Sequence, residues 1–256
     1  MNQNQRAEAF RRMHVKGDPV VLYNIWDAGS AKSVADAGAK ALATGSWSVA
    51  AAQGYGDGEA IPLDLLETIV RRISETVALP LSVDFEGGYA VEPEALGNNV
   101  TRIIATGAIG INFEDQLVGG EGLHPVSLQA ARIAAIRSAA DEAGVALFIN
   151  ARTDVFLKER DRSRHGDLLG QAREREQVYR EAGADGFFAP GLVDRQLIAD
   201  LCSDSVLPVN ILMMPDAPAI SDLAEAGVGR ISFGPGPYRT ITAKLAETCK
   251  RAISAV

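Results

Sequence analysis

The sequence predicts an α/β fold, a parallel (β/α)₈ barrel, and three observations carry this prediction. The chain has 256 residues, close to the roughly 250 residues of a typical barrel. Eight short apolar runs alternate with amphipathic helical stretches, and no linker or charge block interrupts them. Four helical stretches end in an Ala-Gly or Thr-Gly step just before an apolar run, as a helix that feeds a strand does. We therefore expect a single domain over residues 1–256.

The elements follow in order from these patterns. A polar helix from about Gln5 to His14 comes first, and a helical tail ends the chain. The expected strands are Val20–Trp26, Lys40–Gly45, Pro80–Phe85, Gly110–Phe113, Ala146–Ala151, Gly186–Ala189, Pro208–Leu212 and Arg230–Phe233. The expected helices between them, each ending near a glycine, a proline or a short polar stretch, are Leu63–Glu75, Pro93–Ala105, Ser127–Ala143, Gly170–Ala182, Asp194–Cys202 and Ile220–Ala226.

Composition narrows the class of partner. The net charge of −8 and the pI near 5.0 argue against nucleic acid and against an anionic membrane, because both would repel the chain. No apolar run reaches the roughly 18 residues of a membrane span, and the first residues lack a secretory apolar region. Cys202 and Cys249 fit a reducing compartment. We expect a cytoplasmic protein whose small anionic substrate is neutralised by a metal ion or an arginine.

Polar residues at the carboxyl ends of the expected strands predict a metal centre. In a barrel, functional groups gather at these ends and in the loops that follow. Asp84, Glu86 and Glu114 share the parity of inward-facing positions. Three neighbouring carboxylates repel one another unless a cation or a proton lies between them, and hard oxygen ligands suit Mg²⁺ or Mn²⁺. The alternative is three separate, solvated loop carboxylates.

Further polar residues predict a substrate site beside this centre. Arg152 occupies an inward position suited to a bidentate grip on a carboxylate, and its alternative role is a structural ion pair with Asp154 or Glu114. The small residues 44–48 offer backbone N–H groups to an anion. Asp57, in a glycine-rich stretch, either completes the site or is a turn residue.

The loop Gln116–Pro125 is glycine-rich and long enough to close over the barrel mouth as a lid. It contains His124, the one histidine near the expected chemistry. This side chain either transfers a proton or simply lies in solvent.

Five motifs together resemble the isocitrate lyase/phosphoenolpyruvate mutase superfamily, in order and spacing, from about Val20 to Arg239. They are Thr44-Gly45-Ser46-Trp47, Asp57, Val83-Asp84-Phe85-Glu86-Gly87-Gly88-Tyr89, Gly110-Ile111-Asn112-Phe113-Glu114-Asp115-Gln116 and Asn150-Ala151-Arg152-Thr153-Asp154. The resemblance implies a (β/α)₈ barrel that binds 2-oxo acids through Mg²⁺. It also implies a homo-oligomer, commonly a tetramer, that often exchanges its C-terminal helix between subunits.

The resemblance assigns roles position by position. It implies that Asp84 is the direct metal ligand and that Glu86 and Glu114 hold metal-bound waters. The substrate positions it implies are Arg152 as the carboxylate clamp, the backbone amides of Ser46 and Trp47 opposite it, Asp57 as an acid near metal and substrate, and Asn210 as a polar residue on strand seven that reaches the substrate.

The chain also departs from the superfamily pattern. Isocitrate and methylisocitrate lyases carry a Lys-Lys/Arg-Cys-Gly-His loop whose thiol serves as the acid, but the stretch after Gln116 holds no cysteine and no lysine. The Lys and Asn/Thr loop of the mutases and phosphonopyruvate hydrolases is missing as well. Glu86 stands where an aspartate is usual. The fold and the metal site are therefore expected to carry over better than any one activity.

The resemblance implies chemistry through a metal-stabilised enolate of a 2-oxo acid. With the carboxylate cluster and Arg152, it predicts a carbon–carbon lyase that cleaves a small 2-oxo acid or hydroxy-dicarboxylate. The proton would come from water, His124 or another lid residue. Two alternatives stay open. One is a phosphonomutase or phosphonopyruvate hydrolase that acts on a P–C bond, and the other is a barrel that binds 2-oxo acids without turnover.

Overall fold

The computed structural model describes residues 1–254 and contains one sheet of eight parallel strands, in the order β1-β8-β7-β6-β5-β4-β3-β2. The strands are β1 (Val20–Leu22), β2 (Leu42–Ala43), β3 (Leu81–Asp84), β4 (Gly110–Glu114), β5 (Phe148–Arg152), β6 (Gly186–Phe188), β7 (Val209–Leu212) and β8 (Arg230–Ser232). A parallel bridge from Ile25 to Thr44 brings the two ends of this order together beyond β1 and β2. The predicted barrel fold is confirmed.

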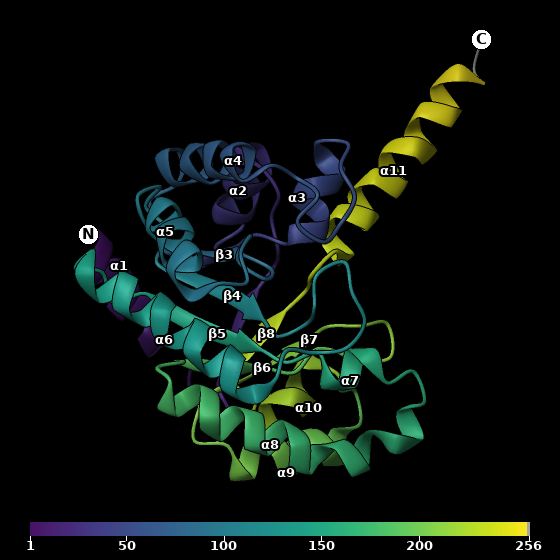
Figure 1. The fold of residues 1–256 in the computed structure, drawn as a ribbon. Helices are drawn as coiled ribbons and strands as arrows, with labels where there is room; N and C mark the ends of the chain where they lie inside the picture. The colour runs from purple at the N-terminus through teal and green to yellow at the C-terminus, as the bar shows by residue number, and fades with distance from the viewer. Residues whose placement is uncertain (255–256) are drawn as a thin grey trace.

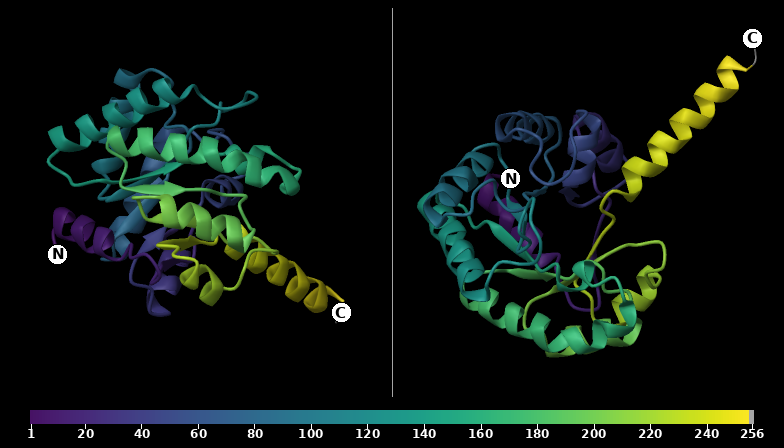
Figure 2. Two further views of the ribbon diagram at one scale, coloured as in Figure 1. Left: turned by 90° about the horizontal axis from the view of Figure 1, so that it is seen from below. Right: turned by 45° about the vertical axis from the view of Figure 1, so that its right-hand side comes forward.

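Most helices form a ring outside the strands (Figure 2, right). The helices of the chain are α1 (Gln3–Arg12), α2 (Ala28–Asp36), α3 (Ser46–Ala52), α4 (Leu63–Thr76), α5 (Pro93–Ile104), α6 (Val126–Glu142), α7 (Val155–Lys158), α8 (His165–Glu181), α9 (Arg195–Asp204), α10 (Ile220–Glu225) and α11 (Gly236–Ile253), with a short 3₁₀ turn at Arg162–Arg164. The last helix, α11, departs from the ring and projects away from the barrel (Figure 1). Among residues 1–254, none of these helices combines the length and the apolar character that a bilayer crossing requires.

The strands β1 and β2 are shorter than the sequence predicts, because the side chain of Asn24 makes hydrogen bonds where the two strands would otherwise continue their backbone pairing. Asn24 is buried just beyond β1. Its Nδ2 donates to the Thr44 carbonyl oxygen at 2.8 Å, and its Oδ1 accepts the N–H groups of Phe233 and Gly234 at 2.9 and 2.8 Å. This amide therefore joins three strand ends, where the expected strand Val20–Trp26 would have used backbone pairing.

The inside of the barrel is layered from apolar to polar. At the amino-terminal end of the strands, α1 inserts Phe10, which is fully buried and packs edge-on against Phe148 of β5 at 5.4 Å between ring centroids. Above this floor, Asn112 Oδ1 accepts hydrogen bonds from Asn150 Nδ2 at 2.9 Å and from Arg230 Nη2 at 3.0 Å. The polar layer separates the apolar floor from the mouth, so chemistry is confined to the carboxyl ends of the strands.

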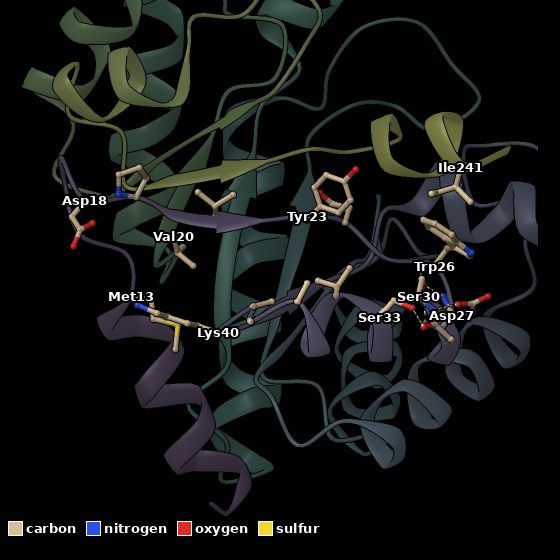
Figure 3. Close-up of a pocket in the computed structure, with 18 of the residues that line it drawn as sticks. Met13, Asp18, Val20, Tyr23, Trp26, Asp27, Ser30, Ser33, Lys40 and Ile241 are labelled. Carbon is tan, nitrogen blue, oxygen red and sulfur yellow. Dashed lines mark hydrogen bonds between the residues drawn. The ribbon is translucent and has the colours of Figure 1, made fainter. Parts of the chain in front are cut away.

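The helical ring is open beside β1. Side chains that point outward from a barrel strand are normally covered by a helix, yet Val21 and Tyr23 are 41% and 42% exposed. A groove of about 990 Å³ runs along this face, between α1, β1 and α2, with Ile241 of α11 at one end (Figure 3). We call it the β1 groove. It exists because α11, which follows β8, does not fold back over the outer face of β1.

Candidate active site

The strand register brings the predicted acids and Arg152 to one end of the barrel. Glu114 pairs with Arg152 across β4 and β5, and Asp84 pairs with Asn112 across β3 and β4. The N–H of Glu114 donates to the carbonyl oxygen of Glu86 at 2.9 Å, which extends the ladder beyond β3. Because alternate residues of a strand share a face, Asp84, Glu86, Glu114 and Arg152 converge on the mouth.

Asp84 ends β3 and is held on both sides by the end of β2. Its N–H donates to Thr44 Oγ1 at 2.9 Å, and its Oδ2 accepts the Ser46 N–H at 3.0 Å. Its Oδ1 is buried and has no hydrogen-bond partner among the described residues. Leaving a buried charged oxygen unpaired is costly. Asp84 therefore presents one fixed, unsatisfied acceptor toward the mouth.

Glu86 is buried and nearly inaccessible, at 4% exposure. It has a left-handed backbone with φ of 49°, and its Oε2 accepts the N–H of Glu59 at 2.9 Å. Burial, reinforced by the negative charge of Asp84, raises the pKa of Glu86 to about 8. Without a cation nearby, this carboxyl holds its proton at neutral pH.

Glu114 and Arg152 form an ion pair at the mouth. Glu114 Oε2 lies 2.8 Å from Arg152 Nη1, while Gln116 Nε2 donates to Glu114 Oε1. Burial raises the pKa of Glu114 to about 7 against the opposing charge of Arg152. Arg152 also donates from Nε and Nη2 to the two oxygens of Asp154, at 2.6 and 2.8 Å. The structural ion pairs that the sequence allowed are therefore present, with both acids.

Arg152 nevertheless keeps donors for a ligand. A guanidinium carries five N–H groups, and the hydrogen bonds to Asp154 use two of them, one on Nε and one on Nη2. Nη1 is in ion-pair contact with Glu114, and the second edge of the guanidinium, formed by Nη1 and Nη2, is distinct from the Nε–Nη2 edge that binds Asp154. The acids orient the guanidinium, and this second edge is the one that could grip a carboxylate.

The stretch 44–48, where we expected backbone N–H groups to face an anion, contains the start of a helix, because α3 begins at Ser46. The Ser46 N–H is directed at Asp84 Oδ2, so a protein carboxylate takes the place of the anion we expected there. Trp47 packs edge-on against Tyr238 at 5.9 Å between ring centroids, and the Arg239 guanidinium carbon lies 4.5 Å from the centre of the Trp47 ring. Trp47 thus forms an aromatic wall between α3 and the start of α11.

Asp57 and Asn210 lie on opposite sides of the mouth. Asp57 is exposed on the loop after α3, and partial burial of its carboxyl together with the charge of Asp84 raises its pKa. Asn210 is fully buried on β7 and exchanges hydrogen bonds with Ser232 Oγ at 3.2 Å. The register places Asn210 in one row with Phe188 and Arg152, so its side chain lies on the inner face at the level of the guanidinium.

His124 lies at the buried base of the glycine-rich loop and not on an exposed lid. Its N–H donates to the Asp115 carbonyl oxygen at 2.7 Å, and its own carbonyl oxygen accepts from Arg175 at 3.3 Å. Burial, together with the charges of Arg132 and Arg175, lowers the pKa of His124. Within residues 1–254, no hydrogen bond or ion pair joins it to Asp84, Glu86 or Glu114.

The donor set fits a magnesium ion better than a metal that needs a protein cage. The described part of the chain holds no group of three His, Cys, Asp or Glu side chains arranged to bind an ion by themselves. Magnesium keeps several waters and is usually held by one or two carboxylates. The unpaired Oδ1 of Asp84 supplies one hard oxygen ligand, and the raised pKa values of Glu86 and Glu114 mark carboxyls whose ionisation a cation would favour.

Sequence reasoning missed Glu59, which the structure places against Glu86. It follows Gly58 in a stretch whose composition predicts only a turn. It also missed Arg230, which is fully buried inside the barrel below Asp84 and has its pKa lowered by burial to about 9. Arg230 shares strand parity with Ser232 in the expected strand Arg230–Phe233, and this alternation could have marked it as inward-facing. Glu59 carries no such signal, since its position depends on contacts between distant segments.

Comparisons with known proteins point to one family. Residues 10–253 match the profile of phosphoenolpyruvate phosphomutase. A solved structure from Burkholderia cenocepacia J2315, named as a candidate phosphonomutase, is 47% identical, covers 98% of this chain and 100% of its own, and superposes with a TM-score of 0.95. The 2-methylisocitrate lyase of Escherichia coli K12 is 29% identical over 82% of this chain and 70% of its own length.

A third relative shares the fold and carries ligands. The structure of a phosphonopyruvate hydrolase in complex with oxalate and Mg²⁺ superposes with a TM-score of 0.85 over 100% of this chain and 88% of its own, at 21% identity. A candidate phosphonomutase and a phosphonopyruvate hydrolase thus share this barrel, and a 2-methylisocitrate lyase resembles the chain in sequence. The resemblance read from the five motifs is confirmed, whereas the individual activity is not fixed by it.

Proposed function

The chain belongs to the phosphoenolpyruvate phosphomutase family, within the isocitrate lyase/phosphoenolpyruvate mutase superfamily, and we propose that it is a Mg²⁺-dependent carbon–carbon lyase. Its substrate in this proposal is a small 2-oxo acid or hydroxy-dicarboxylate. The observation that carries the proposal is the buried, unpaired Oδ1 of Asp84 at the same end of the barrel as the Nη1–Nη2 edge of Arg152. One group suits a cation and the other suits a carboxylate.

Asp84 would hold Mg²⁺, or Mn²⁺, directly, and Glu86 and Glu114 would hold it through water. Support comes from the chemistry of these oxygens and from the hydrolase of the same fold that was solved with Mg²⁺ and oxalate. Bound there, the ion would supply a Lewis acid where negative charge develops on the substrate.

The chain's own residues would bind and orient the substrate. Arg152, held by Glu114 and Asp154, would offer its Nη1–Nη2 edge to the substrate carboxylate. Asn210 offers an amide at the same level of the barrel, and Trp47 borders the mouth. A guanidinium fixed on both sides loses little further freedom when it binds a carboxylate, so the reacting bond would be positioned before it breaks.

The test is product release by the purified protein with and without Mg²⁺. We expect isocitrate, 2-methylisocitrate, oxaloacetate or a related dicarboxylate to release pyruvate, glyoxylate or oxalate, detected by chromatography and by coupled dehydrogenase assays. Release should require the ion and should vanish in Asp84→Ala. If no member of the panel yields such a product while the protein binds Mg²⁺, the lyase proposal is wrong.

A second candidate, phosphonomutase or phosphonopyruvate hydrolase activity, is favoured by the 47% identical relative from Burkholderia cenocepacia. Against it stands the loop 116–125, which lacks the lysine of such enzymes. Phosphorus NMR on phosphonopyruvate separates the two candidates, because P–C chemistry converts the phosphonate signal to a phosphate or phosphate-ester signal. Metal-dependent binding of a 2-oxo acid with no product in either assay would leave a barrel that binds without turnover.

We also propose that the protein is a homo-oligomer in which α11 covers the β1 groove of a second copy. Three large apolar side chains of α11 are exposed, Ile241 at 54%, Leu245 at 67% and Ile253 at 71%, and their spacing places the first two on one helix face. The β1 groove exposes Val21 and Tyr23. Both apolar surfaces would be buried if the helix of one copy completed the ring of another.

A further inference from the structure

Glu59 has a left-handed backbone conformation, and it is hydrogen-bonded to two other residues with the same conformation, Glu86 and Tyr89. Among residues 1–254, the non-glycine residues with positive φ are Glu59 at 58°, Glu86 at 49° and Tyr89 at 59°. Side chains rarely adopt this left-handed region, and where they do, the surrounding contacts hold them in place, often at functional sites. The Glu59 N–H donates to Glu86 Oε2 at 2.9 Å, and the Tyr89 N–H donates to Glu59 Oε1 at 2.7 Å.

These two hydrogen bonds tie together two loops of the mouth. Glu59 belongs to the loop after α3, which also carries Asp57. Glu86 and Tyr89 belong to the segment that follows β3 and Asp84. Because Glu59 lies two residues from Asp57, anchoring it also fixes where the Asp57 loop meets the acids.

A third loop closes on the same point. A Cβ atom at Gly87 would lie 2.9 Å from Val118 Cγ2 and 3.0 Å from Glu59 Oε1. Val118 belongs to the glycine-rich loop 116–125, so this loop packs closely against Gly87 beside the Glu59 carboxylate. Any residue other than glycine at position 87 would displace one of these two side chains. Glu59 is thus at the junction of three mouth loops.

The backbone conformation at position 59 does not require a glutamate side chain. Glycine would adopt the same left-handed conformation without strain, but it would offer no oxygen to the Tyr89 N–H. What a glutamate adds over glycine at this position is therefore the tie between its carboxylate and the Tyr89 N–H.

We infer that Glu59 is a positioning residue that orients the Glu86 carboxylate and the Asp57 loop around the ion that Asp84 would hold. This inference rests on the proposed function, because it requires Mg²⁺ at this end of the barrel. Its backbone N–H donates to Glu86 Oε2, and its side chain holds that N–H in place by accepting from the Tyr89 N–H. Glu59 thus acts through Glu86, in the way that an outer residue orients a ligand group of a metal site.

The lead variant is Glu59→Gly, which removes the acceptor for Tyr89 and relieves the left-handed strain. Mg²⁺ affinity, measured by titration calorimetry, should fall by about 10- to 100-fold, the usual effect of losing such an outer partner. The melting temperature should not fall, because relief of strain offsets the lost hydrogen bond. A purely structural role predicts the opposite pattern, a lower melting temperature with unchanged Mg²⁺ affinity.

Two further variants complete the test. Glu59→Gln keeps an oxygen for the Tyr89 N–H and should stay within about threefold of the wild-type affinity. Glu174→Ala removes an exposed glutamate on α8 and should change nothing. Hydrogen exchange at the Tyr89 amide should quicken in Glu59→Gly and not in Glu59→Gln. If the glycine variant does not fold, Glu59→Asn replaces it, since asparagine tolerates this backbone and is too short to reach Tyr89.

The inference is overturned if Glu59→Gly binds Mg²⁺ as the wild type does, or if Glu59→Gln loses as much affinity as the glycine variant. A wild-type protein that binds no Mg²⁺ in the calorimeter would overturn the proposed function together with this inference. The two failures are therefore distinguishable from one set of titrations.

Discussion

Glu86→Gln should stabilise the metal-free protein and at the same time weaken its hold on Mg²⁺. The carboxyl of Glu86 is buried, and its pKa rises from 4.5 to about 8 on folding. The folded state therefore binds this proton more tightly than the unfolded state does, so folding stability falls as the pH rises from 4.5 through about 8. Glutamine has nearly the same shape and keeps an oxygen for the Glu59 N–H, but it carries no ionisable group.

The magnitude follows from the pKa shift. At 1.36 kcal/mol per pH unit, Glu86 lowers the free energy of unfolding by about 3 kcal/mol at pH 7 and by about 5 kcal/mol at pH 9, relative to low pH where the carboxyl is protonated in both states. These are upper values, because water that enters the mouth of the metal-free protein would reduce them. For a chain of this size, about 3 kcal/mol corresponds to a rise in melting temperature of roughly 6 to 12 °C.

The assay is urea and thermal unfolding of wild type and Glu86→Gln at pH 5, 7 and 9, with and without Mg²⁺. Without the ion, the advantage of the variant should be small at pH 5 and should grow with pH, whereas Glu174→Gln should match the wild type throughout. Added Mg²⁺ should stabilise the wild type most at pH 9 and the variant much less. An advantage that does not depend on pH would refute the assignment of a proton to Glu86.

Three further perturbations test the other parts of the site. Asp84→Ala should abolish Mg²⁺-dependent turnover without lowering the melting temperature of the metal-free protein, because it removes one member of a repelling cluster; turnover at the wild-type rate would exclude Asp84 as the ligand. Arg152→Lys should raise KM by about tenfold or more, since an ammonium cannot reproduce the planar fork; unchanged saturation kinetics would contradict the clamp. Leu245→Asp should reduce the mass measured by light scattering toward that of a monomer, while the control Lys244→Ala leaves it unchanged. An identical mass for both variants would contradict the proposed role of α11 in oligomer formation.

The sequence was sufficient to predict those site residues that lie on strands. Alternation along a strand is a local property, so the inward parity of Asp84 and Glu114 could be read from the residues before any register was known. Parallel neighbours in a barrel then bring such positions to one end without further information. This is why the mouth acids and Arg152, which pairs with Glu114 in the ladder, were predicted together.

The parts that depend on packing between distant segments could not be predicted. His124 is the clearest case. It lies at the buried base of its loop, where Arg175 of α8, 51 positions further along the chain, donates to its carbonyl oxygen. Strand β1 ends early because the Asn24 amide binds Thr44, which follows β2, and the segment after β8. Glu59 has no signal at all, since its left-handed backbone is imposed by its partners and not by its neighbours in the sequence.

The position of the proton donor is the remaining question for a lyase, because the loop that carries a cysteine in relatives carries none here. His124 is a poor candidate as placed: burial and the charges of two arginines lower its pKa, and no hydrogen bond or ion pair among the described residues joins it to Asp84, Glu86 or Glu114. Asp57 has the opposite properties, since it lies at the exposed rim beside Asp84 and its pKa is raised by that neighbour and by burial. A carboxyl that keeps its proton closer to neutral pH is the better general acid. We therefore favour Asp57 over the lid as the source of the proton, which makes the loop anchored by Glu59 part of the chemistry and not only of the entrance.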